Sequence, residues 1–499
     1  MTHVSRAAVV ALTLGSLSGF GFAQPSPATV IDGATILIGD GKTIDKGVIQ
    51  IRNGKISAVG AHVPPAMMAE TFYADGKFVT PGLIDVWTTL GASAAASGVG
   101  GDAADAINRY DRDDMMAAIR HGVTAAYVPA EAGDGVGGVG AVVRYAPKAG
   151  GVSVLKDRAA LHVSVGAGQT ALQRLASIQK FESMWRNALD YRDAQERYKE
   201  DLEEYEKKIK ERAEKAEKEK KTDEGKDKAE KKPDEPKPEE KKEEKPKPDK
   251  PKKGRKPKTD VAPFGLDLSD IVAGGFDEQP PKPEQKPGEE GKPGEKADEK
   301  KEEIKKPEAP PRNPEAEALL DVIDGKIRVR VHAERPAEIV AVIEAAKRYN
   351  LPLVLEGASG ARFVAKSLKK LEAPVVFGVE PQTMLESPGP MRYNSFDAVV
   401  HARQAGIEAY MGSGVPEQTP QLVSRAAAAV AAGLPEREAL PMITSKAATL
   451  LGVDEEIGTI EGGRSADLVV WSGNPFAPGA QVERVYIAGE LVYDIEENE

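Results

Sequence analysis

Residues 326–357 read KIRVRVHAERPAEIVAVIEAAKRYNLPLVLEG, and this stretch decides the fold class. It begins with a short apolar strand pattern, 326–333, continues with an amphipathic helix pattern, 336–350, and ends with a second apolar strand pattern, 351–357. A strand followed by a helix and a second strand is the signature of two parallel strands joined by a helical crossover. The stretch therefore predicts an α/β fold built on a parallel sheet.

The same alternation extends on both sides of this unit. Further strand patterns occur at GLIDVW, TAAYVPA, LHVSVG, APVVFG and IEAYMGSG, and helical patterns at 360–372 and 419–434 separate the later ones. About eight such strands close most economically into a barrel with its helices outside. The glycine-rich segment 133–141 is interpreted as a barrel loop, because no helix N-terminus follows it to bind a phosphate.

The two ends of the chain show a different pattern. Residues 28–60 alternate apolar and polar residues around Asn53-Gly54, which is a hairpin signal, and residues 467–494 alternate in the same way. These segments predict β-strands outside the barrel.

Composition narrows the function classes. The chain has 499 residues, no cysteine and a formal net charge of −11, so disulfides, thiolate metal sites and a basic nucleic-acid-binding surface are not expected. Residues 1–23 resemble a signal peptide with a cleavage site after Ala23, the alternative being an uncleaved anchor. No other apolar run is long enough to cross a bilayer, so after cleavage we expect a periplasmic or secreted protein that is not an integral membrane protein.

Residues 194–312 form a charged low-complexity insertion with too few apolar side chains to fold on its own. Its upstream edge carries apolar residues at alternating spacings of four and three between Met184 and Ile209, which predicts a helix over about 180–218. Either a coiled coil or a plain surface helix fits this pattern. The apolar island 261–276 either docks on a surface or has no role.

Several motifs together resemble the metal-dependent amidohydrolase superfamily, and its exported imidazolonepropionase-like branch in particular. They are GKISAVG at 54–60, VTPGLIDVW at 79–87, ITSKAATLLGV at 443–453 and the run from Ile457 to Asp494. The resemblance implies a (β/α)8 TIM-like barrel plus a small composite β-sandwich made from both chain ends. The implied domains are a signal peptide at 1–23, sandwich parts at 24–80 and 453–499, barrel parts at 81–193 and 313–452, the first ending in the long helix, and the insertion at 194–312.

The resemblance also implies a chemistry. In this family one or two divalent metals, often zinc, activate a water molecule that attacks an amide or cyclic amide carbon. Histidines and carboxylates at the carboxyl ends of the barrel strands hold the metal.

Here the sequence departs from the family pattern at four expected ligand positions. The two histidines that follow Pro-Gly-Leu-Ile-Asp are Trp87 and Thr89, the histidine of the sixth strand is Gly357, and the aspartate of the last strand is Gly414. An indole has no lone pair for a metal and a hydroxyl is a weak ligand. Only His332 matches a family ligand, and one imidazole does not hold a catalytic metal tightly. The family can also use a carboxylated lysine on the fourth strand as a metal ligand, and Lys180 is the one lysine near that position in the sequence.

These departures leave three hypotheses. The first is a pseudoenzyme without a metal, acting in binding or scaffolding as a homo-oligomer or beside a related amidohydrolase. The second is an active hydrolase with catalytic candidates His332 and Glu356, one weakly held zinc, and a pocket of Trp87, Thr89, His162, Glu334, Gly357 and Gly414. For His162 and His332, an interior histidine without a catalytic role is the plainer interpretation. The third is an interaction protein that acts through the charged insertion.

Overall fold

The computed structural model describes residues 28–92, 98–110, 112–130, 133–146, 151–166, 170–226, 305–378 and 395–497. The predicted signal peptide, the apolar island and most of the charged insertion lie outside these ranges. Contacts within the chain divide it into one unit of 1–198 with 309–499 and a second of 199–308. Within the described residues, no helix combines the length and the apolar character that crossing a membrane requires.

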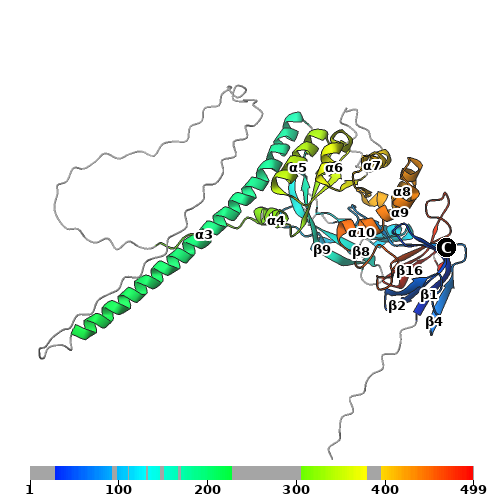
Figure 1. The fold of residues 1–499 in the computed structure, drawn as a ribbon, viewed down its shortest axis with the longest axis horizontal. Helices are drawn as coiled ribbons and strands as arrows, with labels where there is room; N and C mark the ends of the chain where they lie inside the picture. Colours follow the sequence, from blue (N-terminus) through cyan, green and yellow to red (C-terminus); the bar gives the residue numbers. More distant parts are fainter. Residues whose placement is uncertain are drawn as a thin grey trace, which may run out of the picture. The chain divides into compact units, whose positions relative to one another are not determined.

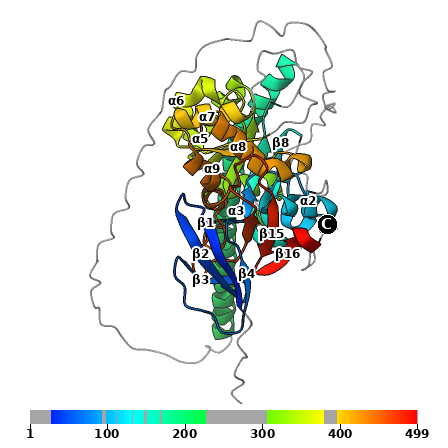
Figure 2. The same cartoon turned by 90° about the vertical axis from the view of Figure 1, so that its right-hand side faces the viewer.

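The first unit contains two eight-stranded sheets. The first sheet has the order β16-β15-β14-β5-β1-β2-β3, with β4 paired to β1, and so joins strands from both ends of the chain (Figure 2). Its strands are β1 Ala28–Leu37, β2 Thr43–Arg52, β3 Lys55–Gly60, β4 Ala69–Tyr73, β5 Phe78–Pro81, β14 Leu468–Trp471, β15 Val482–Ile487 and β16 Glu490–Asp494. Asn53 and Gly54 both have positive φ between β2 and β3, which confirms the predicted hairpin.

The second sheet forms a nearly closed barrel with the order β13-β12-β11-β10-β9-β8-β7-β6. Its strands are β6 Leu83–Asp85, β7 Val123–Val128, β8 Gly135–Ala146, β9 Gly151–Ser164, β10 Arg328–Ala333, β11 Leu353–Gly357, β12 Val375–Phe377 and β13 Ala409–Met411. Just beyond the edge strands β6 and β13, the Gly414 amide donates to the Trp87 carbonyl at 2.8 Å. The TIM-like architecture predicted from the sequence is therefore present.

The barrel differs from the regular (β/α)8 prediction at β8. This strand runs antiparallel to both β7 and β9, whereas the other neighbouring pairs in the barrel are parallel. The interpretation of 133–141 as a loop is wrong, because residues 135–141 lie in the buried strand β8. A Cβ on Gly140 would lie 2.3 Å from the Tyr127 hydroxyl, so a glycine is needed for β8 to pass this ring.

Helices flank the barrel strands, and α5 to α8 follow one another along one side of it (Figure 1). The helices are α1 Ala103–Ala106, α2 Arg112–Arg120, α3 Ala171–Lys226, α4 Pro314–Ile323, α5 Pro336–Tyr349, α6 Ala365–Leu371, α7 Ser395–Gln404, α8 Leu422–Ala431, α9 Glu436–Met442 and α10 Ser445–Leu451. The helix predicted over 180–218 is present and longer. Near its start, Met184, Trp185 and Ala188 are buried in the main core, so the first part of the predicted seam packs within its own chain.

Candidate functional site

The carboxyl ends of the barrel strands bring the predicted site residues to adjacent strands. His332 on β10 pairs in register with Glu356 on β11, and Arg330 on β10 pairs with His162 on β9. Trp87 follows β6 by two residues. Parallel strands place equivalent side chains in layers across the barrel, and here the layer below the mouth is charged.

The Glu356 carboxylate is the centre of this charged layer. It is fully buried, and it accepts hydrogen bonds from Nε of Arg330 and from Nε2 of His162, the latter at 3.1 Å. Burial alone would raise the pKa of Glu356, but Arg330 and His162 favour the charged form and lower this pKa to about 2. Glu356 is therefore an ionised carboxylate at neutral pH, already bound by two side chains.

Arg330 is held on three sides. Besides Glu356, its guanidinium donates to the Val86 carbonyl at 2.7 Å and lies 3.8 Å from the centre of the Tyr127 ring. Arg330 is 2% exposed. A buried cation of this kind is stable only when it is paired, and this one has a carboxylate, a carbonyl and an aromatic face.

His162 completes the layer as an interior residue and is 2% exposed. Because an ionised carboxylate only accepts hydrogen bonds, the Nε2 of His162 carries the hydrogen that Glu356 accepts. Its Nδ1 is buried without a hydrogen-bond partner among the described residues. This position agrees with the interior interpretation of His162.

The Trp87 side chain fills space above this layer. Trp87 is 6% exposed. A Cβ built on Gly378 would lie 2.3 Å from the Trp87 ring, and a Cβ built on Gly412 would lie 2.7 Å from the Cβ of Trp87. The ring centroid of Trp87 is 5.6 Å from that of His332. The indole therefore occupies barrel space beside Gly378 and Gly412, which follow β12 and β13.

His332 faces the mouth and has a side chain that is 20% exposed. Its Nε2 lies 3.7 Å from Oε1 of Glu334, as the alternation along the strand predicts. The other oxygen of Glu334 accepts hydrogen bonds from the amide and the hydroxyl of Ser359. Glu334 therefore holds the turn after β11 as well as facing His332.

The remaining predicted positions offer no strong ligand. Gly357 has φ +74, which strains any other residue, and a Cβ there would lie 1.9 Å from Oε1 of Glu334, so the Glu334 side chain would have to move. The Thr89 hydroxyl lies 3.5 Å from the Gly414 carbonyl. Lys180 lies on α3 rather than on a strand, and its Nζ is 4.0 Å from an Asp134 carboxylate oxygen.

These residues do not fit the metal that the family implies. The described residues contain no cluster of three or more histidine, cysteine, aspartate or glutamate side chains arranged to hold a metal ion. The Glu334 carboxylate, 3.7 Å from His332, is also bound by Ser359, while Glu356 is bound to Arg330 and His162. The two candidate oxygen ligands nearest His332 are thus bound to other residues.

Sequence reasoning missed Asp85 and Arg330, two of the buried charges near the mouth. Asp85 accepts hydrogen bonds from the amides of Trp87 and Ser413, at 3.1 and 3.0 Å, and its burial raises its pKa to about 6. The other missed charge is Arg330. The alternating RVRVHA pattern contained the signal for it, because Arg330 lies two residues before His332 and so points to the same side of the strand.

Comparison with known proteins agrees with the fold. Residues 291–492 match the amidohydrolase family. Two curated relatives are an amidohydrolase, tasK, of Hapsidospora irregularis, 25% identical over 37% of this chain and 19% of the relative, and an imidazolonepropionase of Maricaulis maris (strain MCS10), 30% identical over 27% of this chain and 39% of the relative. The matched region thus spans well under half of each relative.

A crystal structure of an amidohydrolase from Thermotoga maritima MSB8 superposes with a TM-score of 0.60 at 21% identity, covering 93% of this chain and 100% of that one. At this identity the likeness shows the fold.

Proposed function

On the premise that residues 291–492 carry an amidohydrolase-family domain, we propose that this chain is an exported protein of that fold whose metal site is lost. Hydrolysis of C–N bonds is the chemistry that the family match supports. The finer proposal is that this chain is a pseudoenzyme, which uses the fold for binding or scaffolding, as a homo-oligomer or beside an active relative.

The packing of Trp87 is the observation that carries this proposal. A metal at the barrel mouth needs open space and converging ligands, but the indole lies against Gly378 and Gly412. The neighbouring cation is Arg330, which already neutralises Glu356. The buried arginine beside Glu356 and the tryptophan at an expected ligand position both support the proposal, since a metal-dependent hydrolase needs free ligands and a bound water.

The test measures metal and activity on the same purified full-length protein. The protein is exposed to zinc, manganese or iron, desalted and submitted to elemental analysis, and it is then assayed with cyclic amides and dipeptides. We expect near-zero metal per chain and no hydrolysis above that of the buffer. One tightly held metal per chain, lost in His332→Ala together with an activity, would overturn the proposal.

A second candidate function follows from the position of His332. Its partly exposed imidazole lies 3.7 Å from Glu334, a pair that could relay a proton at the mouth without a metal. Hydrolysis that needs no metal and is abolished equally by His332→Ala and Glu334→Gln would favour this candidate over the pseudoenzyme.

A further inference from the structure

A pocket lies at the end of the barrel opposite the mouth. Its wall contains residues from the amino ends of four successive strands: Arg328 begins β10, Leu353 begins β11, Pro374 precedes β12 and Glu408 precedes β13. Its volume is about 350 Å³, at the lower end of the range for small-molecule sites. Catalytic sites of TIM-like barrels lie at the carboxyl ends of the strands, so this pocket is a separate site.

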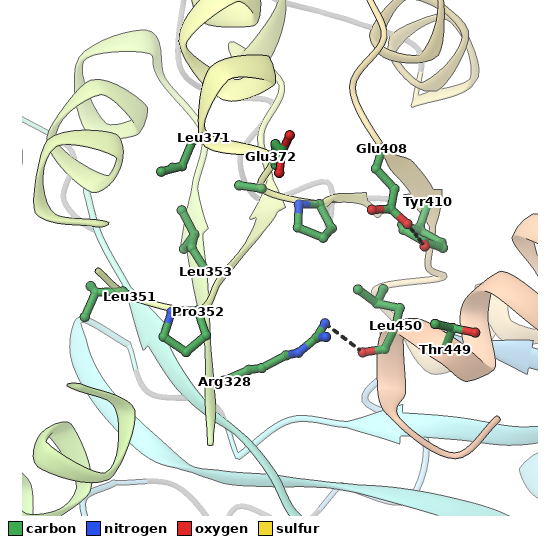
Figure 3. A pocket seen from close by; sticks show the side chains of 12 residues that line it. Arg328, Leu351, Pro352, Leu353, Leu371, Glu372, Glu408, Tyr410, Thr449 and Leu450 are labelled. Carbon is green, nitrogen blue, oxygen red and sulfur yellow. Dashed lines mark hydrogen bonds between the residues drawn. The ribbon is translucent and has the colours of Figure 1, made fainter. Parts of the chain in front are cut away.

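The pocket separates charges of opposite sign (Figure 3). Arg328 lies on one wall and points toward Leu450, whereas Glu372 and Glu408 lie on the facing wall. Aliphatic side chains line the sides of the pocket, with Leu351 and Leu353 on one side and Leu450 on the other. A ligand that fits this lining carries a negative group, an aliphatic middle and a positive group.

Two of the three charged groups, Arg328 and Glu408, are fixed by contacts with their own chain. One guanidinium nitrogen of Arg328 donates to the Leu450 carbonyl at 3.2 Å, and a guanidinium has five N–H donors in all. The hydroxyl of Tyr410, which also lines the pocket, donates to the Glu408 carboxylate. Side chains held in one orientation lose little entropy when a ligand binds, which favours recognition.

A second cation, Lys156, lies near Arg328 and adds positive charge at this end of the pocket, which favours an anionic group of a ligand. Lys156 donates to the Leu451 carbonyl at 3.1 Å, close enough to Arg328 for the two charges to repel. Burial, and then Arg328, lower the pKa of Lys156. A carboxylate placed beside Arg328 would relieve this repulsion.

We propose that this pocket binds a small aliphatic zwitterion of the amino-acid type, with its carboxylate on Arg328 and its ammonium facing Glu408 and Glu372. This inference rests on the proposed binding function and names amino-acid-like zwitterions as the class of ligand that the protein binds. Because the pocket lies at the other end of the barrel, the metal measurement above is unaffected by the outcome here.

The test is calorimetric titration of the full-length protein with L-leucine and with 6-aminohexanoate, whose charges are farther apart. Leucinamide, which lacks the carboxylate, and N-acetyl-leucine, which lacks the ammonium, are the matched control ligands. We expect saturable binding of one zwitterion per chain and at least about tenfold weaker binding of both controls, since hydrogen bonds to charged groups are the strong ones. If neither zwitterion binds saturably, the proposal is wrong.

Variants place the binding in this pocket. Arg328→Met and Glu408→Gln should each weaken the binding of the preferred zwitterion by about tenfold or more. Arg437→Met and Glu490→Gln, at exposed positions elsewhere, should leave the affinity unchanged. If Arg328→Met unfolds because α10 loses a contact, Glu408→Gln and the exposed Glu372→Gln decide the question. Equal affinity in the folded pocket variants and the wild type would overturn the assignment.

Discussion

The guanidinium of Arg330 on β10 donates to the carboxylate of Glu356 on the adjacent strand β11, and these side chains are 3% and 0% exposed. This pair joins two strands in the interior of the barrel, so the Arg330 cation is buried together with its counter-ion. Under the proposal that the metal site is lost, Glu356 is occupied by Arg330 and His162 and is not available to a metal.

Removal of one partner of this pair should destabilise the protein strongly. Glu356→Gln leaves the buried Arg330 guanidinium without an anion, and Arg330→Met leaves Glu356 with His162 alone. Loss of one partner of a buried pair costs about 3–5 kcal/mol. Urea unfolding should show this loss in each single variant and a smaller loss in the double variant than the sum of the two. Fully additive losses would contradict a coupled pair, and Glu490→Gln is the exposed control.

Acid should remove the stability that Glu356 contributes. The pKa of this carboxyl is lowered from its ordinary 4.5 to about 2 in the folded protein, so the folded state binds its proton more weakly than the unfolded state does. The contribution is present above about pH 4.5 and is lost as the pH falls toward 2, an amount of about 3 kcal/mol. Unfolding free energies of wild type and Glu356→Gln should converge over this window, and parallel curves would refute it.

Asp85 should make the pH dependence of stability opposite in sign to that of Glu356, so that its contribution falls as the pH rises. Burial raises its pKa from 3.8 to about 6, so protonated Asp85 favours the folded state. Its contribution is present below about pH 4 and is lost as the pH rises through 6. Asp85→Asn should remove this slope, because an amide oxygen can still accept the hydrogen bonds from Trp87 and Ser413. A slope between pH 4 and 6 that persists in Asp85→Asn would assign it to another group.

Local sequence patterns were enough to predict much of the fold, but not the contacts of the site. The unit at 326–357 contains its own strand, helix and strand, so its periodicity predicts β10, α5 and β11. The hairpin at Asn53-Gly54 is equally local. In contrast, the antiparallel β8 depends on Tyr127 packing over Gly140, which no periodicity reveals.

The candidate site shows the same division between local and distant information. The replacements at Trp87, Thr89, Gly357 and Gly414 could be read from motifs. The bond between Glu356 and His162 joins residues 194 positions apart and depends on strand order and register. The hypothesis that named Glu356 as a catalytic candidate could therefore not anticipate its two partners, Arg330 and His162.

Introduction of histidines at Trp87 and Thr89 should not by itself create a metal site. Trp87→His combined with Thr89→His recreates the family pattern on the first strand and opens the space now filled by the indole. We nevertheless expect near-zero metal per chain after exposure to zinc and desalting. Glu356 remains bound to Arg330, and the wild-type glycine at Gly357, whose φ is +74, still supplies no ligand side chain. Loss of the buried indole should itself lower stability by about 3 kcal/mol, as for other large core truncations, so folding is checked first by circular dichroism. One tightly held zinc per folded chain would show that Trp87 and Thr89 alone prevent metal binding, and that the rest of the site is still competent.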